Sequence, residues 1–239
     1  MDRPLIHIPV GKWLPEFRFT LLQIVTHIGS WAPLAVLICR GFTNNLTVNP
    51  IQYLTYYTGD TAIRLLILSL ACTPAHSIFG FKEPLKLRRP LGLYAFIYAA
   101  LHFSIFLFDY NADPKLLYEA IFEKRYALVG FAAFLLLLPM ALTSTKGWQR
   151  RLGKNWKRLH QFVYLAGLLV VIHYVWLVKS DIRTPLAYGA IVVALLVARI
   201  PGVRRAFASA RSWVAGKVRA TRPGRQTIPD RVSTRKDLR

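Results

Sequence analysis

The sequence predicts an all-α membrane protein, a bundle of six transmembrane helices with both termini in the cytoplasm. Three observations lead to this fold class. The chain of 239 residues is 54% apolar and only 18% charged, with a mean hydropathy of +0.34. Its apolar residues gather in six blocks, each close to the ~20 residues that a bilayer-spanning helix needs. The basic residues concentrate between these blocks and in one tail.

The six apolar blocks set the order of the helices. None of them alternates as a barrel strand would, so helices are the expected spanning structure. Pro33, Pro74 and Pro139 lie inside blocks, where a neighbouring helix can satisfy the freed carbonyl. The sequence shows no internal repeat. The expected helices cover residues 21–39, 61–79, 91–108, 126–143, 159–178 and 185–200.

The charge of the connections predicts the orientation. Residues 82–89 carry four basic side chains and one acid, and residues 146–158 carry six basic side chains and no acid. By the positive-inside rule these connections face the cytoplasm. The chain then divides into a cytoplasmic segment (1–20), a six-helix transmembrane domain (21–200) and a basic cytoplasmic tail (201–239). In the tail we expect a helix lying on the membrane lipids, followed by disorder from Thr221.

Composition excludes several other classes. The net charge of +21 would usually indicate nucleic-acid binding, but here the charge is not spread over a folded basic face. We therefore expect no nucleic-acid partner. Two cysteines, Cys39 and Cys72, are too few for a disulfide framework or a cysteine-based metal site. The first 19 residues lack the pattern of a cleavable secretory signal.

Histidines inside the membrane carry the expected chemistry, because ionisable side chains in spanning helices are functional candidates by default. Five of the six histidines fall in or at the edge of the apolar blocks. His102 lies ~20 Å beyond Arg89 and His173 ~22 Å beyond Arg158, at 1.5 Å per helical residue. Both helices run outward, so the two imidazoles share one depth in the outer half of the bilayer.

Two neutral imidazoles at one depth on different helices can clamp a haem iron from both faces. We expect no carboxylate at this depth, which argues against a site for a hard cation. A zinc site would need a third or fourth ligand, and none is evident. His102 and His173 are therefore the predicted metal ligands.

His160 indicates a second centre near the inner surface. It lies ~20 Å from His173 along the same helix, a separation that suits two stacked redox centres, although ~140° of rotation separates the two side chains. His27 is the favoured partner for this inner site, and His76 the other candidate. The alternative for all these histidines is a structural role as hydrogen-bonding residues in a membrane protein without redox activity.

Several motifs resemble one known family. The most specific runs from Thr143-Ser144-Thr145 through Arg151-Leu152-Gly153-Lys154 to Trp156 and His160. Further matches are Gly59-Asp60-Thr61-Ala62, Thr73-Pro74, Arg88-Arg89-Pro90-Leu91-Gly92-Leu93, Leu101-His102 and His173-Tyr174. Together they closely resemble the YedZ/MsrQ family, the haem-binding membrane subunits of the protein-methionine-sulfoxide reductase system, over residues 21–199. That family belongs with the ferric-reductase-like transmembrane domains.

The resemblance implies an electron-transfer subunit with no catalytic residue of its own. It implies one or two haem b groups held by His102, His160 and His173, and an FMN. Electrons would come from a cytoplasmic flavin reductase or the quinone pool. They would pass to a periplasmic molybdopterin subunit that reduces methionine sulfoxide in oxidised proteins. The implied location is the bacterial inner membrane, with several passes.

The chain itself shows no Gly-rich dinucleotide fingerprint and no soluble domain for FAD or NADPH, so it is not expected to take hydride unaided. Two alternatives to the reductase subunit stay open at this point. One is a free-standing transmembrane ferric or quinone reductase that serves a small acceptor. The other is a non-redox membrane protein with structural histidines.

Overall fold

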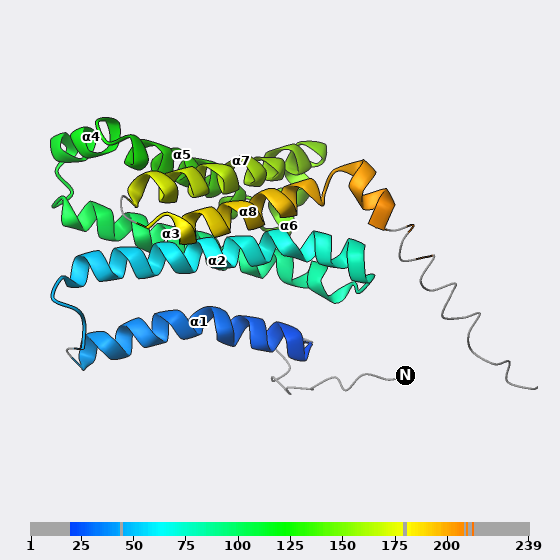
Figure 1. The fold of residues 1–239 in the computed structure, drawn as a ribbon, viewed down its shortest axis with the longest axis horizontal. Helices are drawn as coiled ribbons and strands as arrows, with labels where there is room; N and C mark the ends of the chain where they lie inside the picture. Colours follow the sequence, from blue (N-terminus) through cyan, green and yellow to red (C-terminus); the bar gives the residue numbers. More distant parts are fainter. Residues whose placement is uncertain (1–19, 44, 179–180, 208, 210–211, 213–239) are drawn as a thin grey trace, which may run out of the picture.

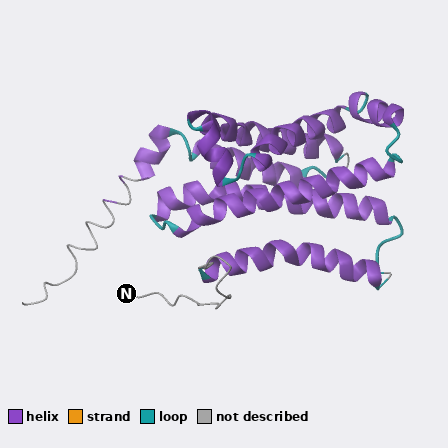
Figure 2. Cartoon of the chain, turned by 180° about the vertical axis from the view of Figure 1, so that it is seen from behind, coloured by secondary structure: helices purple, strands orange, loops and turns teal. Residues whose placement is uncertain are grey.

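The computed structural model describes residues 20–43, 45–178, 181–207, 209 and 212, and this part of the chain is helical throughout apart from its connections (Figures 1 and 2). The labelled helices are α1 (Leu21–Phe42), α2 (Pro50–Phe79), α3 (Glu83–Asp109), α4 (Pro114–Phe122), α5 (Arg125–Leu142), α6 (Lys146–Leu152), α7 (Lys154–Leu177) and α8 (Arg183–Val197).

Five helices, α1, α2, α3, α5 and α7, are long and apolar enough to cross a membrane. The sixth expected span, residues 185–200, falls on α8, which is long and apolar enough only when joined to Pro201–Phe207 across a bend of 83°. The predicted all-α membrane fold is confirmed. The orientation of the termini stays a prediction. Residues 1–19 lie outside the described residues, as does the predicted tail except for residues 201–207, 209 and 212.

Helix boundaries follow local capping signals. α2 begins at Pro50 rather than at the expected residue 61, because the Asn49 side chain accepts a hydrogen bond from the Gln52 amide and proline suits the first turn. The short helix α4, which the apolar blocks do not predict, starts in the same way. There the Asp113 carboxylate accepts from the amides of Lys115 and Leu116. These caps lengthen α2 and add a helix over one end of the bundle.

The long helices pack in two antiparallel pairs. α2 packs along α3, and α5 packs along α7, while α8 lies against α7 and α2. α1 lies at the edge of the bundle and meets the rest mainly through α3 (Figure 1). We call the two ends of the bundle the α4 end and the α6 end, after the short helix found at each (Figure 1).

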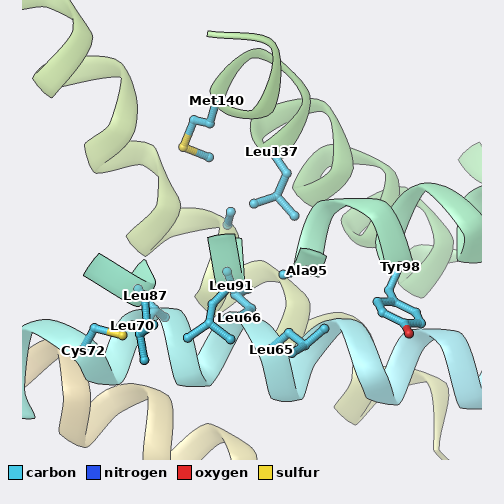
Figure 3. Packing of buried hydrophobic residues seen from close by; sticks show 11 residues of the cluster. Leu65, Leu66, Leu70, Cys72, Leu87, Leu91, Ala95, Tyr98, Leu137 and Met140 are labelled. Carbon is cyan, nitrogen blue, oxygen red and sulfur yellow. The ribbon is translucent and has the colours of Figure 1, made fainter. Parts of the chain in front are cut away.

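A buried cluster joins the two pairs (Figure 3). It holds Leu66 and Leu70 of α2, Leu91 of α3, Leu137 of α5 and Ala166 of α7 among others. In a bilayer, such interior packing rather than removal of surface from water holds helices together. The cluster leaves the space between the pairs open toward the α4 end, where the cavity described below lies.

Near two of the internal prolines, a side chain from another segment forms hydrogen bonds with backbone groups of the helix. Near Pro33, the Tyr98 hydroxyl of α3 donates to the Ser30 carbonyl (2.8 Å) and accepts from the Leu34 amide (3.0 Å). The hydroxyl therefore lies between a carbonyl and an amide that would otherwise bond each other within α1, and it fixes α1 to α3. Pro74 lacks the N–H that would reach the Leu70 carbonyl, and the Arg199 guanidinium donates to that carbonyl instead.

Candidate functional site

A cavity of about 770 Å³ lies between the two helix pairs toward the α4 end of the bundle. α2, α3, α5 and α7 form its walls, and Ile121 of α4 lines it as well. Most of the lining is apolar, and the volume is within the 300–1,000 Å³ typical of cofactor and small-molecule sites. The described part of the chain thus contains a space fit for a large, mostly apolar ligand.

His102 of α3 and His173 of α7 both line this cavity. Their ring centroids are 6.1 Å apart and the ring planes cross at 85°. Residue counting along the two helices predicts one depth for this pair, and the structure brings the two rings together. Across the described residues, no other two histidine rings make such a contact.

Each imidazole is oriented by a backbone carbonyl of the partner helix in its pair. Nδ1 of His102 donates to the Thr55 carbonyl of α2 (2.9 Å), and Nδ1 of His173 donates to the Tyr126 carbonyl of α5 (2.7 Å). A carbonyl can only accept, so the proton is on Nδ1 and the lone pair is on Nε2 in both rings. A hydrogen bond from the ring nitrogen that does not bind the metal is the usual way in which proteins fix the tautomer of a metal-binding histidine.

Each imidazole also packs on a glycine. A Cβ built on Gly59 of α2 would lie 3.0 Å from Nδ1 of His102, and one on Gly130 of α5 would lie 2.6 Å from Nδ1 of His173. In both pairs the glycine is four residues after the accepting carbonyl, and that carbonyl precedes its histidine by 47 positions. The sequence showed no repeat, yet the two helix pairs repeat this local arrangement.

The dimensions of the histidine pair fit an iron held between two axial ligands. Two metal–nitrogen bonds of about 2 Å each, with ~1 Å from each nitrogen to its ring centre, put the two centroids about 6 Å apart. The rings of Phe103, Phe131 and Phe134 stack along one wall, with centroids 4.8 and 5.7 Å apart. The residues present therefore fit a haem with two histidine ligands.

The rim of the cavity is polar at the α4 end. Asn49, Gln52, Asp109 and Tyr110 line it there. Lys124, next to the rim, donates a 2.7 Å hydrogen bond to the Tyr110 hydroxyl, and this bond raises the pKa of Lys124. A ligand with polar groups at one edge would place that edge at this end.

One expectation about the site is wrong. Asp60 of α2 lines the cavity, although no carboxylate was expected near the depth of the histidine pair. It was missed because α2 begins at Pro50, which takes Asp60 into the helix. Arg64 forms a 2.7 Å ion pair with Asp60, and the Tyr188 hydroxyl of α8 donates to the Asp60 carboxylate (2.9 Å). Even with Asp60, the described residues contain no group of three or more potential metal ligands from His, Cys, Asp and Glu.

The other candidate histidines lie elsewhere. His160, near the α6 end, stacks on Trp156 with centroids 3.9 Å apart, and its Nδ1 lies 3.1 Å from the Trp156 carbonyl. His27 of α1 meets the Tyr94 hydroxyl of α3 at 2.9 Å. Nδ1 of His76 bonds the Phe81 carbonyl beyond the end of α2. In the described ranges neither His27 nor His76 makes a ring contact with His160, so the structure does not bring the predicted inner pair together.

Comparison with known proteins gives consistent matches. The family model for the ferric reductase like transmembrane component matches residues 58–171. The protein-methionine-sulfoxide reductase heme-binding subunit MsrQ of Xanthomonas euvesicatoria pv. vesicatoria (strain 85-10) is 42% identical over 185 residues, which are 74% of this chain and 85% of that protein. The MsrQ of Herminiimonas arsenicoxydans is 38% identical over 187 residues, with 77% and 86% covered. No solved structure matches the chain.

These identities extend over most of both chains, and the family model covers His102 and α7 as far as residue 171, two residues before His173. The resemblance found in the sequence motifs is confirmed: this chain, a multi-pass membrane protein, belongs to the MsrQ family of ferric-reductase-like transmembrane proteins.

Proposed function

We propose that this chain is the haem-binding electron-transfer subunit of a methionine sulfoxide reductase system, and that His102 and His173 are the axial ligands of a haem b. The pair of imidazoles with centroids 6.1 Å apart inside a 770 Å³ cavity carries this proposal. The relatives support it, because they are named as heme-binding subunits of that system.

The residues around the cavity bind and orient the cofactor, and the bound haem supplies one-electron redox chemistry at its iron. The Thr55 and Tyr126 carbonyls hold both imidazoles with the proton on Nδ1, so each Nε2 would be available to bind the haem iron. The rings of Phe103, Phe131 and Phe134 give the cavity one apolar wall, against which the flat face of a porphyrin would pack. No side chain of the site needs to form a covalent intermediate, in line with a subunit that is not itself catalytic.

The proposed direction of electron flow follows from the charge of the two ends. The six basic residues between Lys146 and Arg158 lie at the α6 end, and their side chains are exposed. By the positive-inside rule, this end faces the cytoplasm and the α4 end faces the periplasm of an inner membrane. Electrons would enter from a cytoplasmic flavin reductase or a quinol. They would leave near the histidine pair to a periplasmic molybdopterin methionine sulfoxide reductase.

His160 has a less complete environment for ligation than the histidine pair. Its ring stacks on Trp156, and its Nδ1 lies 3.1 Å from the Trp156 carbonyl. We keep it as the proposed ligand of a second, inner haem, or as a residue on the path of electrons from the α6 end. FMN remains part of the proposal on the strength of the sequence resemblance alone.

The absorption spectrum of the purified full-length protein tests this function. A Soret band with sharp reduced α and β bands, and a pyridine haemochromogen of the b type, are expected. The haem-to-protein ratio gives the number of haems, and flavin released on denaturation reports FMN. A protein without a Soret band would be a non-redox membrane protein. A haem protein that reduces small acceptors but not the periplasmic subunit would be a free-standing reductase.

A further inference from the structure

We propose that Gly59 and Gly130 are positioning residues of the histidine pair. The missing Cβ at each lets its imidazole lie close to the neighbouring helix, at the distance and angle that an axial ligand needs. This inference rests on the proposed haem function and adds to it two residues that bear no chemical group of their own.

The steric argument is strongest at Gly130. A Cβ there would lie 2.6, 2.8 and 3.1 Å from Nδ1, Cε1 and Cγ of His173, distances at which something must move. At Gly59 the corresponding Cβ would lie 3.0 and 3.1 Å from Nδ1 and Cε1 of His102. The ring is the part that can move, because helix backbone on both sides is tied by its own hydrogen bonds. A moved ring would weaken its hydrogen bond to the Tyr126 or Thr55 carbonyl.

The repetition of the arrangement argues against chance packing. Each helix pair uses the same three parts: a carbonyl acceptor, a glycine one turn later and a histidine on the facing helix. Together the two sets hold the rings at 85° to each other. Other glycines of the described helices behave differently: a Cβ on Gly41 would meet nothing within 4 Å, and one on Gly189 would lie 3.0 Å from Cγ1 of Val171.

Gly189 is therefore a matched control. It is as tightly packed as Gly59, but against an aliphatic side chain of α7 instead of an imidazole. If the two cavity glycines serve only close helix packing, Gly→Ala at positions 59, 130 and 189 will destabilise the protein without changing the haem. If they position the ligands, only the substitutions at 59 and 130 will change the haem spectrum.

The first test is electron paramagnetic resonance of the oxidised protein in detergent. Imidazole planes that cross near a right angle give a strongly anisotropic low-spin ferric signal, which the unmodified protein should show. Gly130→Ala should shift this signal or convert it to high spin, and Gly59→Ala should do so less. Gly189→Ala and Gly41→Ala should leave it unchanged. A Gly130→Ala protein with the unaltered signal and full haem content would overturn the proposal.

The second test needs no haem. In protein purified without haem, Gly130→Ala should lower the midpoint of thermal unfolding, and the same substitution in a His173→Ala background should lower it far less, because the imidazole is gone. An equal loss in both backgrounds would mean ordinary helix packing and would overturn the proposal. If Gly130→Ala alone does not fold, the double variant should still fold like His173→Ala, and its failure would count against the proposal in the same way. A wild-type protein that never binds haem would refute the proposed function, while this cycle would still decide the steric role of Gly130.

Discussion

The Arg199 guanidinium donates to the backbone carbonyl of Leu70, the acceptor that Pro74 leaves without its helical donor. A second hydrogen bond joins Arg199 to the Tyr164 hydroxyl (2.9 Å), and the guanidinium also lies over the Tyr164 ring. The Arg199 side chain, just after α8, thus donates to the carbonyl that lacks its helical donor in α2 and also contacts α7. This ties together three helices near the α6 end.

We expect Arg199→Met to lower the free energy of unfolding by about 1.5–3 kcal/mol, the usual range for a hydrogen bond to a charged group. The Pro74→Ala variant restores an N–H that can reach the Leu70 carbonyl, so Arg199→Met should be less damaging in that background. Thermal unfolding of the four proteins in one detergent measures the difference. Equal losses in both backgrounds would show that the Leu70 contact contributes nothing.

Tyr98→Phe should destabilise the docking of α1 on α3. The buried Tyr98 hydroxyl bonds both the Ser30 carbonyl and the Leu34 amide, and its removal takes away both of these hydrogen bonds between α3 and α1, at a cost of about 1–3 kcal/mol. Proteolysis in the connection between α1 and α2 should also become faster. Tyr53→Phe, which removes an exposed hydroxyl bonded to Arg40, is the control and should change neither measurement.

Substitution of either proposed haem ligand, His102 or His173, should have the same effect on the haem spectrum. His102→Ala and His173→Ala should each remove the same low-spin b-type signal, and the double variant should lose no more, because one iron needs both ligands. His160→Ala should keep that signal and either remove a second haem or slow reduction from the cytoplasmic side. His76→Ala should change little, since its ring serves the Phe81 carbonyl. Retention of the full low-spin spectrum in His102→Ala would refute the pairing and make His27 with His160 the next pair to test.

Reporter fusions test the orientation on which the direction of electron flow depends. Fusions after Lys154 and at the C-terminus should report the cytoplasm, and a fusion at Asp113, the cap of α4, should report the periplasm. A periplasmic signal at Lys154 would reverse the bundle and exchange the proposed donor and acceptor sides.

The exposed basic residues at the α6 end should attract the cytoplasmic electron donor. Arg150, Arg151 and Lys154 are exposed, and a cluster of this sign attracts an acidic flavoprotein or a reduced flavin. Replacing all three with Gln should slow reduction of the haem by a cytoplasmic donor and weaken its dependence on salt, with haem content unchanged. The same rate and the same salt dependence as in the unmodified protein would limit the region to anchoring on lipid.

Much of this architecture could be predicted from the sequence, because a lipid environment leaves long apolar helices as the main choice. The shared depth of His102 and His173 followed from counting residues along two such helices. The early start of α2 and the existence of α4 were also within reach, since Asn49-Pro50 and Asp113-Pro114 are ordinary signals of a helix start. They were missed because apolar blocks alone set the expected boundaries.

Other features depend on contacts between distant segments and leave little trace in the local pattern. Backbone carbonyls accept the histidine protons, and every residue type has such a carbonyl. The role of Gly59 shows only when His102 lies against it, and Gly130 likewise depends on His173. Asp60 looked like the end of a loop until the start of α2 placed it beside the cavity, with Arg64 one turn away as the only local hint.

The division of the cavity between two helix pairs has a mechanical consequence. The α2–α3 pair contains one complete half of the clamp, and the α5–α7 pair contains the other, each with its own glycine and its own acceptor. An iron bound by one histidine from each pair would link the two pairs to each other. The helices within each pair pack together more closely than helices of different pairs do. Haem binding would therefore add a link between the two halves, beside the buried cluster and the Arg199 contacts that already join them. Its loss would weaken the contact between the halves more than the packing inside either half.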